Sequence, residues 1–128
     1  MATRSNPRPA AGPDAEAVLT KAVLRAATRL GMTSKALAAV IGVSEASVSR
    51  MRAGAYALPR GHKAFELGVL FVRLYRSLDS LVGGDDAVAR AWLANRNTAL
   101  DASPLALIQT VPGLMNVIAY LDARRAVI

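Results

Sequence analysis

Apolar residues recur along most of the chain at intervals of three and four, which places them on one side of an α-helix. A sustained alternation of apolar and polar residues, which would predict a β-strand, does not occur in the sequence. We therefore expect an all-α protein. The expected helices cover residues 14–30, 33–41, 45–52 and 62–82, a fifth segment that begins at 85 or 86, a sixth that begins at 103–104, and 110–123.

Helix start and stop signals support these ranges. Side chains that can accept from free backbone amides precede the apolar stretches: Thr33 or Ser34, Ser44, Asp85 or Asp86, and Ser103 with Pro104 behind it. Glycines, which end helices in the left-handed conformation, follow them: Gly31, Gly54, Gly83 and Gly84. The sequence leaves open which member of each alternative pair is the cap.

Two of the expected helices differ in how much of their surface is apolar. The first helix has one apolar side, and these residues are expected to point inward: Val18, Leu19, Ala22, Val23, Ala26 and Leu30. The helix over 62–82 has a second apolar side in its first half, formed by Phe65, Val69 and Val72. A helix of that kind is either central to the fold or paired with a second subunit, and both interpretations stay open.

The segment "TSKALAAVIGVSEASVSRMRAG" has the residues that two short, tightly crossing helices need. Ala38 is small where the second helix would cross the first, and Gly42 supplies the positive φ of the turn. Val43, Val48 and Met51 then pin the second helix to the core. The remaining residues of that helix are polar, which indicates an outward surface suited to the major groove of DNA.

Residues 30–57 resemble the Cro/repressor-type helix-turn-helix of Xre-family regulators. The resemblance implies a DNA-binding surface with two kinds of contact. Base edges would be approached by Ser44, Glu45, Ala46 and Arg50, and phosphates would be held by Lys35, Ser47, Ser49 and Arg52. Glu45 would accept from a cytosine amino group, orient Arg50, or act only on the helix N-terminus.

The distribution of charge agrees with a polyanionic partner for the first half. Residues 1–63 contain ten basic and three acidic side chains, whereas residues 64–128 contain six of each, so the whole net charge of +7 lies in the first half. Basic side chains that neutralise phosphates release counterions, so this half is suited to a polyanion. The resemblance implies that the polyanion is double-stranded operator DNA. A solvated basic surface without a ligand is the simpler alternative.

The second half resembles a different and more specific domain. Its pattern is Trp92, Leu93, Asn97, Leu100, Ser103, Pro104, Leu107, Gly113, Val117 and Leu121. This run is similar to the C-terminal toxin-binding domain of Xre, MbcA and ParS antitoxins. The resemblance implies a type II antitoxin that dimerises, represses its own operon and blocks a RES-domain toxin that consumes NAD. It also implies toxin contacts by Trp92, Asn97, Ser103, Arg124, Arg125, Val127 and Ile128, the last four in a tail that reaches the toxin's active site. For the tail, a frayed helix end whose arginines favour the C-terminal dipole is an equal alternative.

The expected domain organisation follows from these two resemblances. A disordered arm (1–13) precedes the helix-turn-helix domain (14–60), a long linker and dimerisation helix (61–84), the small helical toxin-binding domain (85–123) and a C-terminal tail (124–128). One alternative is a stand-alone Xre-type regulator whose second half only dimerises or binds another protein. Another is an interaction module that binds no DNA.

Composition argues against several other classes. The chain has no cysteine and a single histidine, His62, so disulfides and the usual metal-ligand clusters are not expected. The sequence offers no nucleophile with a base and no phosphate-binding glycine loop, so we expect no catalytic residue, no cofactor and no enzyme. Its first residues lack the apolar stretch of a secretory signal, and we expect a cytoplasmic protein without a membrane span.

Overall fold

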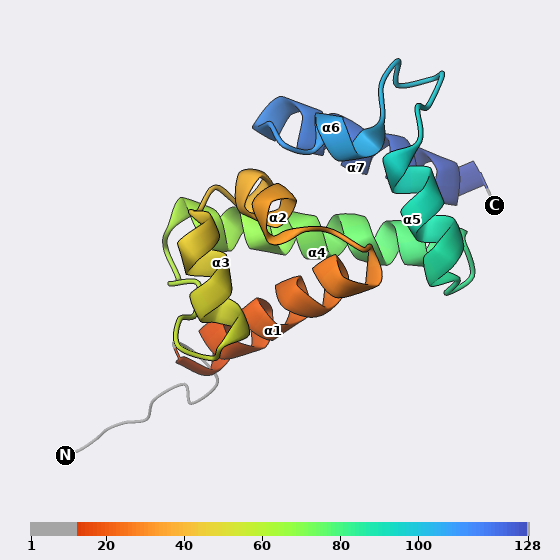
Figure 1. Cartoon of the computed structure of the whole chain (residues 1–128). Helices are drawn as coiled ribbons and strands as arrows, with labels where there is room; N and C mark the ends of the chain where they lie inside the picture. Colours follow the sequence, from red (N-terminus) through yellow and green to blue (C-terminus); the bar gives the residue numbers. More distant parts are fainter. Residues whose placement is uncertain (1–12, 128) are drawn as a thin grey trace.

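The computed structural model describes residues 13–127, and these form an all-helical fold (Figure 1). The helices are α1 (Pro13–Arg29), α2 (Ser34–Ile41), α3 (Glu45–Arg52), α4 (Lys63–Leu81), α5 (Asp86–Ala94), α6 (Pro104–Leu107) and α7 (Val111–Val127). The predicted all-α class, with a helix-turn-helix followed by a helical C-terminal part, is confirmed. The predicted arm over residues 1–13 lies outside the described residues except for Pro13, where α1 begins, and Ile128 lies outside them too.

The observed helix caps follow from the neighbouring residues in the sequence. They also show which member of each alternative pair is the cap. Thr33 caps α2 and accepts from the Ala36 amide at 3.0 Å. Asp85 caps α5 through the Ala87 amide at 3.0 Å. Ser44 and Ser103 cap α3 and α6 as predicted. The last helix differs from its expected range, because α7 continues to Val127 instead of ending near residue 123.

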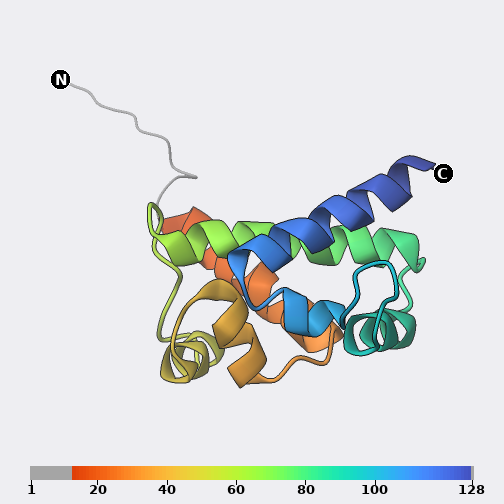
Figure 2. The same ribbon diagram turned by 90° about the horizontal axis from the view of Figure 1, so that it is seen from above.

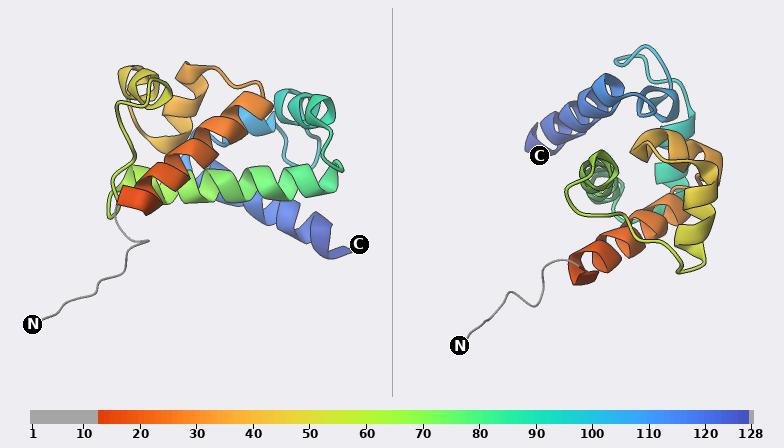
Figure 3. Two further views of the ribbon diagram at one scale, coloured as in Figure 1. Left: turned by 90° about the horizontal axis from the view of Figure 1, so that it is seen from below. Right: turned by 90° about the vertical axis from the view of Figure 1, so that its left-hand side faces the viewer.

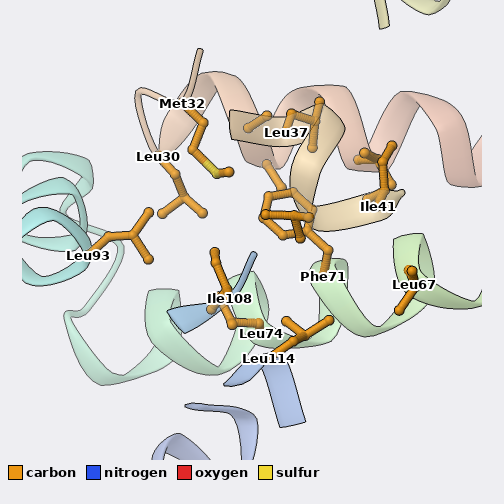
Figure 4. Close-up of a cluster of buried hydrophobic side chains, with 14 of the residues drawn as sticks. Leu30, Met32, Leu37, Ile41, Leu67, Phe71, Leu74, Leu93, Ile108 and Leu114 are labelled. Carbon is orange, nitrogen blue, oxygen red and sulfur yellow. The ribbon is translucent and has the colours of Figure 1, made fainter. Parts of the chain in front are cut away.

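Helix α4 lies at the centre of the fold. An end-on view shows α1, α2 and α7 arranged around it, and α7 runs along it for much of its length (Figures 2 and 3). Phe71 and Leu74 of α4 are fully buried. In the close-up, Phe71 points toward Leu37 of α2, whereas Leu74 lies beside Leu114 of α7 (Figure 4). One apolar core therefore continues through α4 from the first half of the chain to the second, and the division into separate domains stays a prediction.

The expected inward position of Val18 on α1 is wrong. Val18 is 68% exposed, whereas Val23 is fully buried. The cause is the close approach of α1 to α4 at Gly68, where an added Cβ would lie 3.2 Å from Val23 Cγ2 and 3.4 Å from Leu19 Cδ2. Because Leu19 and Val23 face α4, Val18 is turned about a quarter of a helical turn away from it.

A polar junction joins α5 to the C-terminal end of α1. The Arg90 side chain donates from Nε to the Arg29 carbonyl at 2.8 Å, which satisfies an acceptor that the end of a helix leaves free. The Arg29 guanidinium donates to the Tyr75 hydroxyl of α4 at 3.4 Å. That bond, together with the carboxylates of Asp86 and Asp79, raises the pKa of Arg29. The junction fixes the orientation of α5 against the first half of the chain.

The turn between α6 and α7 depends on a glycine. The Thr110 hydroxyl accepts from the Gly113 amide at 3.2 Å, so Thr110 caps α7. A Cβ added to Gly113 would lie only 1.9 Å from the Leu107 carbonyl oxygen. The turn therefore closes only when residue 113 has no side chain.

We expect Gly113→Ala to lower the free energy of unfolding by about 1–3 kcal/mol, the usual cost of overpacking, because the turn must open to admit the methyl group. Urea denaturation followed by circular dichroism measures this. Gly84→Ala is the control, since Gly84 has φ +81° but no atom within 4 Å of the added Cβ. A cost for Gly113→Ala no greater than that of the control would contradict the steric explanation.

Candidate nucleic-acid interface and partner-binding face

The crossing of α2 and α3 has the geometry that the sequence predicts. Gly42 ends α2 with φ 74°, and its amide donates to the Ala38 carbonyl at 2.9 Å. Val48 and Met51 are buried and hold the inner side of α3 against the core. An added Cβ at Gly42 would meet Leu67 only at an ordinary 3.5 Å, so the positive φ and not a lack of space favours glycine there.

The outer side of α3 carries the residues that the sequence assigns to DNA. All but one of them are exposed, and Ser47 is half-buried: Ser44, Glu45, Ala46, Ser47, Ser49, Arg50 and Arg52. Lys35 on α2 is exposed as well. The Arg52 Nε donates to Ser34 Oγ at 3.1 Å, which joins the end of α3 to the start of α2. The structure thus brings the predicted residues together on one basic surface, and their DNA contacts stay predictions.

Hydrogen bonds along α3 give its hydroxyl groups and Arg50 defined positions. Ser44 Oγ accepts from the Ser47 amide at 3.0 Å, so this hydroxyl caps the helix. Arg50 Nη2 donates to Ser47 Oγ at 3.0 Å. Within the described residues Arg50 is thus oriented by Ser47 and not by Glu45. Glu45 lies in the first turn of α3, where its charge favours the helix N-terminus.

Sequence reasoning missed one residue beside this surface. The Tyr56 ring lies under Arg50, with 5.8 Å between Arg50 Cζ and the ring centroid. Tyr56 follows the glycine that ends α3, and the sequence gives no sign that the chain turns back toward the helix. A lone aromatic residue just after a helix-ending glycine was the signal available.

The second half presents an aromatic strip across α5 and α7, which we define as Val88, Trp92, Tyr120 and Arg124. Trp92 stacks on Tyr120 with 6.3 Å between ring centroids, and Arg124 Nη1 donates to the Tyr120 hydroxyl at 3.2 Å. Val88 is 49% exposed at one end of the strip. The strip contains two of the residues predicted to bind a toxin, Trp92 and Arg124. Sequence reasoning missed Tyr120.

Two other predicted toxin contacts stabilise the loop between α5 and α6. Asn97 Oδ1 accepts from the amides of Ala99 and Leu100 at 2.9 and 3.1 Å. Ser103 Oγ accepts from the Ala106 amide at 3.2 Å. Asp101 in the same loop has φ 62°, a conformation that glycine adopts more easily. Asn97 Oδ1 and Ser103 Oγ therefore accept hydrogen bonds within the chain, and any contact of these residues with a toxin stays a prediction.

The last turns of α7 are fixed to α4 by a polar cluster. Asp122 accepts from Arg73 at 2.5 Å and from Ser77 at 3.1 Å. Arg125 donates to the Ser77 hydroxyl at 2.9 Å. The predicted tail at residues 124–127 is thus a continuation of α7, and Arg125 already has partners within the chain.

An apolar groove of about 610 Å³ lies between α1 and α4. Its apolar wall consists of Ala15, Val18, Leu19, Ala22, Phe65, Val69 and Val72, and Arg73, Arg76 and Arg125 stand near one end. Val18 and Val69 are 68% and 46% exposed. The second apolar side of the helix over 62–82 is therefore only partly covered within one chain.

Neither a metal site nor a membrane span is found in the described part of the chain. Among residues 13–127, no three histidine, cysteine or acidic side chains gather as ligands for a metal ion. None of the helices there combines the length and the apolar composition needed to cross a bilayer.

Comparison with protein families gives two matches that together cover most of the chain. Residues 9–73 match the antitoxin Xre-like helix-turn-helix domain. Residues 77–126 match the antitoxin Xre/MbcA/ParS C-terminal toxin-binding domain. A search of curated proteins returned no significant match.

The order of the two domains agrees with the predicted one, and their boundary falls within α4. A helix-turn-helix and a toxin-binding domain imply DNA and a toxin as partners. The chain belongs to the Xre family of antitoxins, with a DNA-binding helix-turn-helix followed by an Xre/MbcA/ParS toxin-binding domain.

Proposed function

We propose that this chain is the antitoxin of a type II system, that it blocks a RES-domain, NAD-consuming toxin, and that it represses its own operon as a homodimer in the cytoplasm. The proposal is carried by one observation. Within the same fold, the outward-facing helix α3 carries basic residues, and a separate aromatic strip lies on α5 and α7. It catalyses no reaction, and inhibition is steric. The alternative is a stand-alone Xre-type regulator without a toxin.

In the proposed DNA complex, α3 enters the major groove. Arg50 reads a guanine, because its fork of N–H donors matches the two acceptors of that base. Lys35 and Arg52, at the start of α2 and the end of α3, hold phosphates. The Ser47 hydroxyl supports Arg50 from the same helix.

In the proposed dimer, the α1–α4 groove of one chain covers that of the other. The exposed valines Val18 and Val69 then become buried, which is the usual fate of a contiguous apolar patch of this kind. Two α3 helices presented by the dimer would contact half-sites one helical turn apart.

In the proposed toxin complex, the strip from Val88 to Arg124 contacts the toxin surface, and the end of α7 covers its active site. Aromatic and arginine side chains are the residue types that contribute most to protein–protein binding. Arg124, which is exposed on α7, would contact the toxin directly.

We expect Arg50→Ala to lower discrimination between the operator and a single-base variant by about 1–3 kcal/mol, because a bidentate contact to one base is lost. Lys35→Ala and Arg52→Ala should weaken binding to all sequences and each reduce the salt slope by about one. Fluorescence anisotropy at several salt concentrations separates the two effects. Arg124→Ala, far from α3, is the control. Unchanged discrimination in Arg50→Ala would contradict base reading by this residue.

We expect Val69→Asp to convert the dimer to a monomer, because the new carboxylate would be buried without a partner. Sedimentation equilibrium measures the mass. Val111→Asp is the matched control, since Val111 on α7 is similarly exposed (50%) and lies outside the groove. A dimer that survives Val69→Asp and Val18→Asp would exclude this face as the interface.

We expect a chain truncated after Asp122 to lose inhibition of NAD consumption by the RES-domain enzyme encoded beside it. Truncation also removes the bond between Arg125 and Ser77 of α4, so full-length Ser77→Ala, which removes the buried hydroxyl and leaves the tail intact, is the control for its loss. Full inhibition by the truncated chain would rule out occlusion by the tail. Failure of the two proteins to co-purify would favour the stand-alone regulator instead.

A further inference from the structure

The Arg50 guanidinium is held between two groups of its own chain. Its Nη2 donates to Ser47 Oγ at 3.0 Å, and its Cζ lies 5.8 Å from the centroid of the Tyr56 ring. Ser47 precedes Arg50 by one helical turn, whereas Tyr56 belongs to the loop after α3. Arg50 is therefore oriented by a group on its helix and by another outside it.

The end of α3 brings Tyr56 back toward Arg50. The Ala55 amide donates to the Arg50 carbonyl at 2.8 Å, and the Gly54 amide donates to the Met51 carbonyl at 3.1 Å. Gly54 has φ 75°. This pair of bonds around a left-handed glycine is the Schellman motif, which reverses the chain against the last turn of a helix. The residue that follows the motif is Tyr56.

A second attachment fixes the loop from the other side. The Leu58 amide donates to the Thr20 hydroxyl of α1 at 2.9 Å, and Thr20 in turn donates to the Glu16 carbonyl at 2.7 Å. Thr20 and Leu58 are both buried. The Tyr56 ring itself is half-buried and packs against the core. The backbone of Tyr56 thus lies between two anchored positions, and the packing of its ring against the core places the ring beside Arg50.

We infer that Tyr56 is a positioning residue for DNA reading, whose ring holds the Arg50 guanidinium ready for a guanine in the major groove. An arginine that is already ordered loses less side-chain freedom on binding than one that moves freely. The benefit concerns only the base that Arg50 contacts, because contacts to phosphates do not depend on this orientation. This inference rests on the proposed DNA-reading function and names a residue that it did not include.

The test uses the full chain and a duplex that the unchanged chain selects from a random pool. The base pair whose discrimination Arg50→Ala abolishes identifies the position that Arg50 reads. Tyr56→Leu should then lower discrimination at that base pair by about two- to fivefold, the effect of an exposed cation–π contact. Tyr56→Phe retains the ring and should keep full discrimination. The salt slope and the discrimination at other base pairs should not change in either variant.

Ser47→Ala provides a second test on the helix, because it removes the hydroxyl that Arg50 contacts without altering the core. It should lower discrimination at the same base pair, and it remains informative if Tyr56→Leu does not fold. Discrimination by folded Tyr56→Leu equal to that of the unchanged chain, or by Ser47→Ala where Tyr56→Leu does not fold, would overturn the inference while leaving the DNA-reading proposal intact. A chain that selects no duplex, or an Arg50→Ala variant that discriminates normally, would overturn both.

Discussion

The burial of α4 between α1 and α2 on one side and α7 on the other is the constraint on which the rest of the structure depends. Phe71 and Leu74 are fully buried on this one helix, and each contributes about 1.5–3 kcal/mol through the removal of its side chain from water. Their contacts belong to different halves of the chain. Neither half can therefore lose its packing on α4 without affecting the other, and α3 and the aromatic strip are held in a fixed relation.

Polar contacts near the surface add to the apolar packing that sets how each helix is rotated. Arg90 fixes α5 against the end of α1, and Asp122 joins α7 to α4 through Arg73 and Ser77. Single ion pairs at exposed positions stabilise a protein little. Here their effect is geometric, because a rotation of α7 would move Tyr120 and Arg124 away from Trp92. The Asp122 cluster thus supports the rotation of α7 at which the strip forms, alongside the buried Leu114, Val117 and Leu121.

The sequence was informative where structure depends on neighbouring residues and weak where it depends on distant ones. Thr33, Ser44 and Gly42 act within a few residues of themselves, and local rules predicted their positions. Val18 was misplaced because the side of α1 that becomes buried is chosen by Gly68, many residues away. The end of α7 was placed too early because the bonds between Arg125 and α4 cannot be read from local periodicity.

The candidate sites show the same difference between features set by neighbouring residues and features set by distant ones. The polar face of α3 follows from a local pattern of apolar residues, so all of its predicted members were found together. Tyr56 and Tyr120 were missed because each gains its role from a partner on another segment, Arg50 and Trp92. The sequence around an aromatic residue does not show whether its ring supports a binding residue or packs in the core. Long-range packing therefore decides which aromatic residues accompany a binding surface.

The positions of the two surfaces bear on how one small chain can have two partners. Helix α3 lies near one end of α4, and the C-terminal end of α7 lies near the other (Figures 1 and 2). The net positive charge of the chain lies in the first half, and the second half has no net charge. The two halves therefore present different electrostatic environments to a phosphate backbone and to a protein surface. The DNA contacts and the toxin contacts that we propose therefore share no residue within one chain, and each can be altered by substitution without changing the other surface.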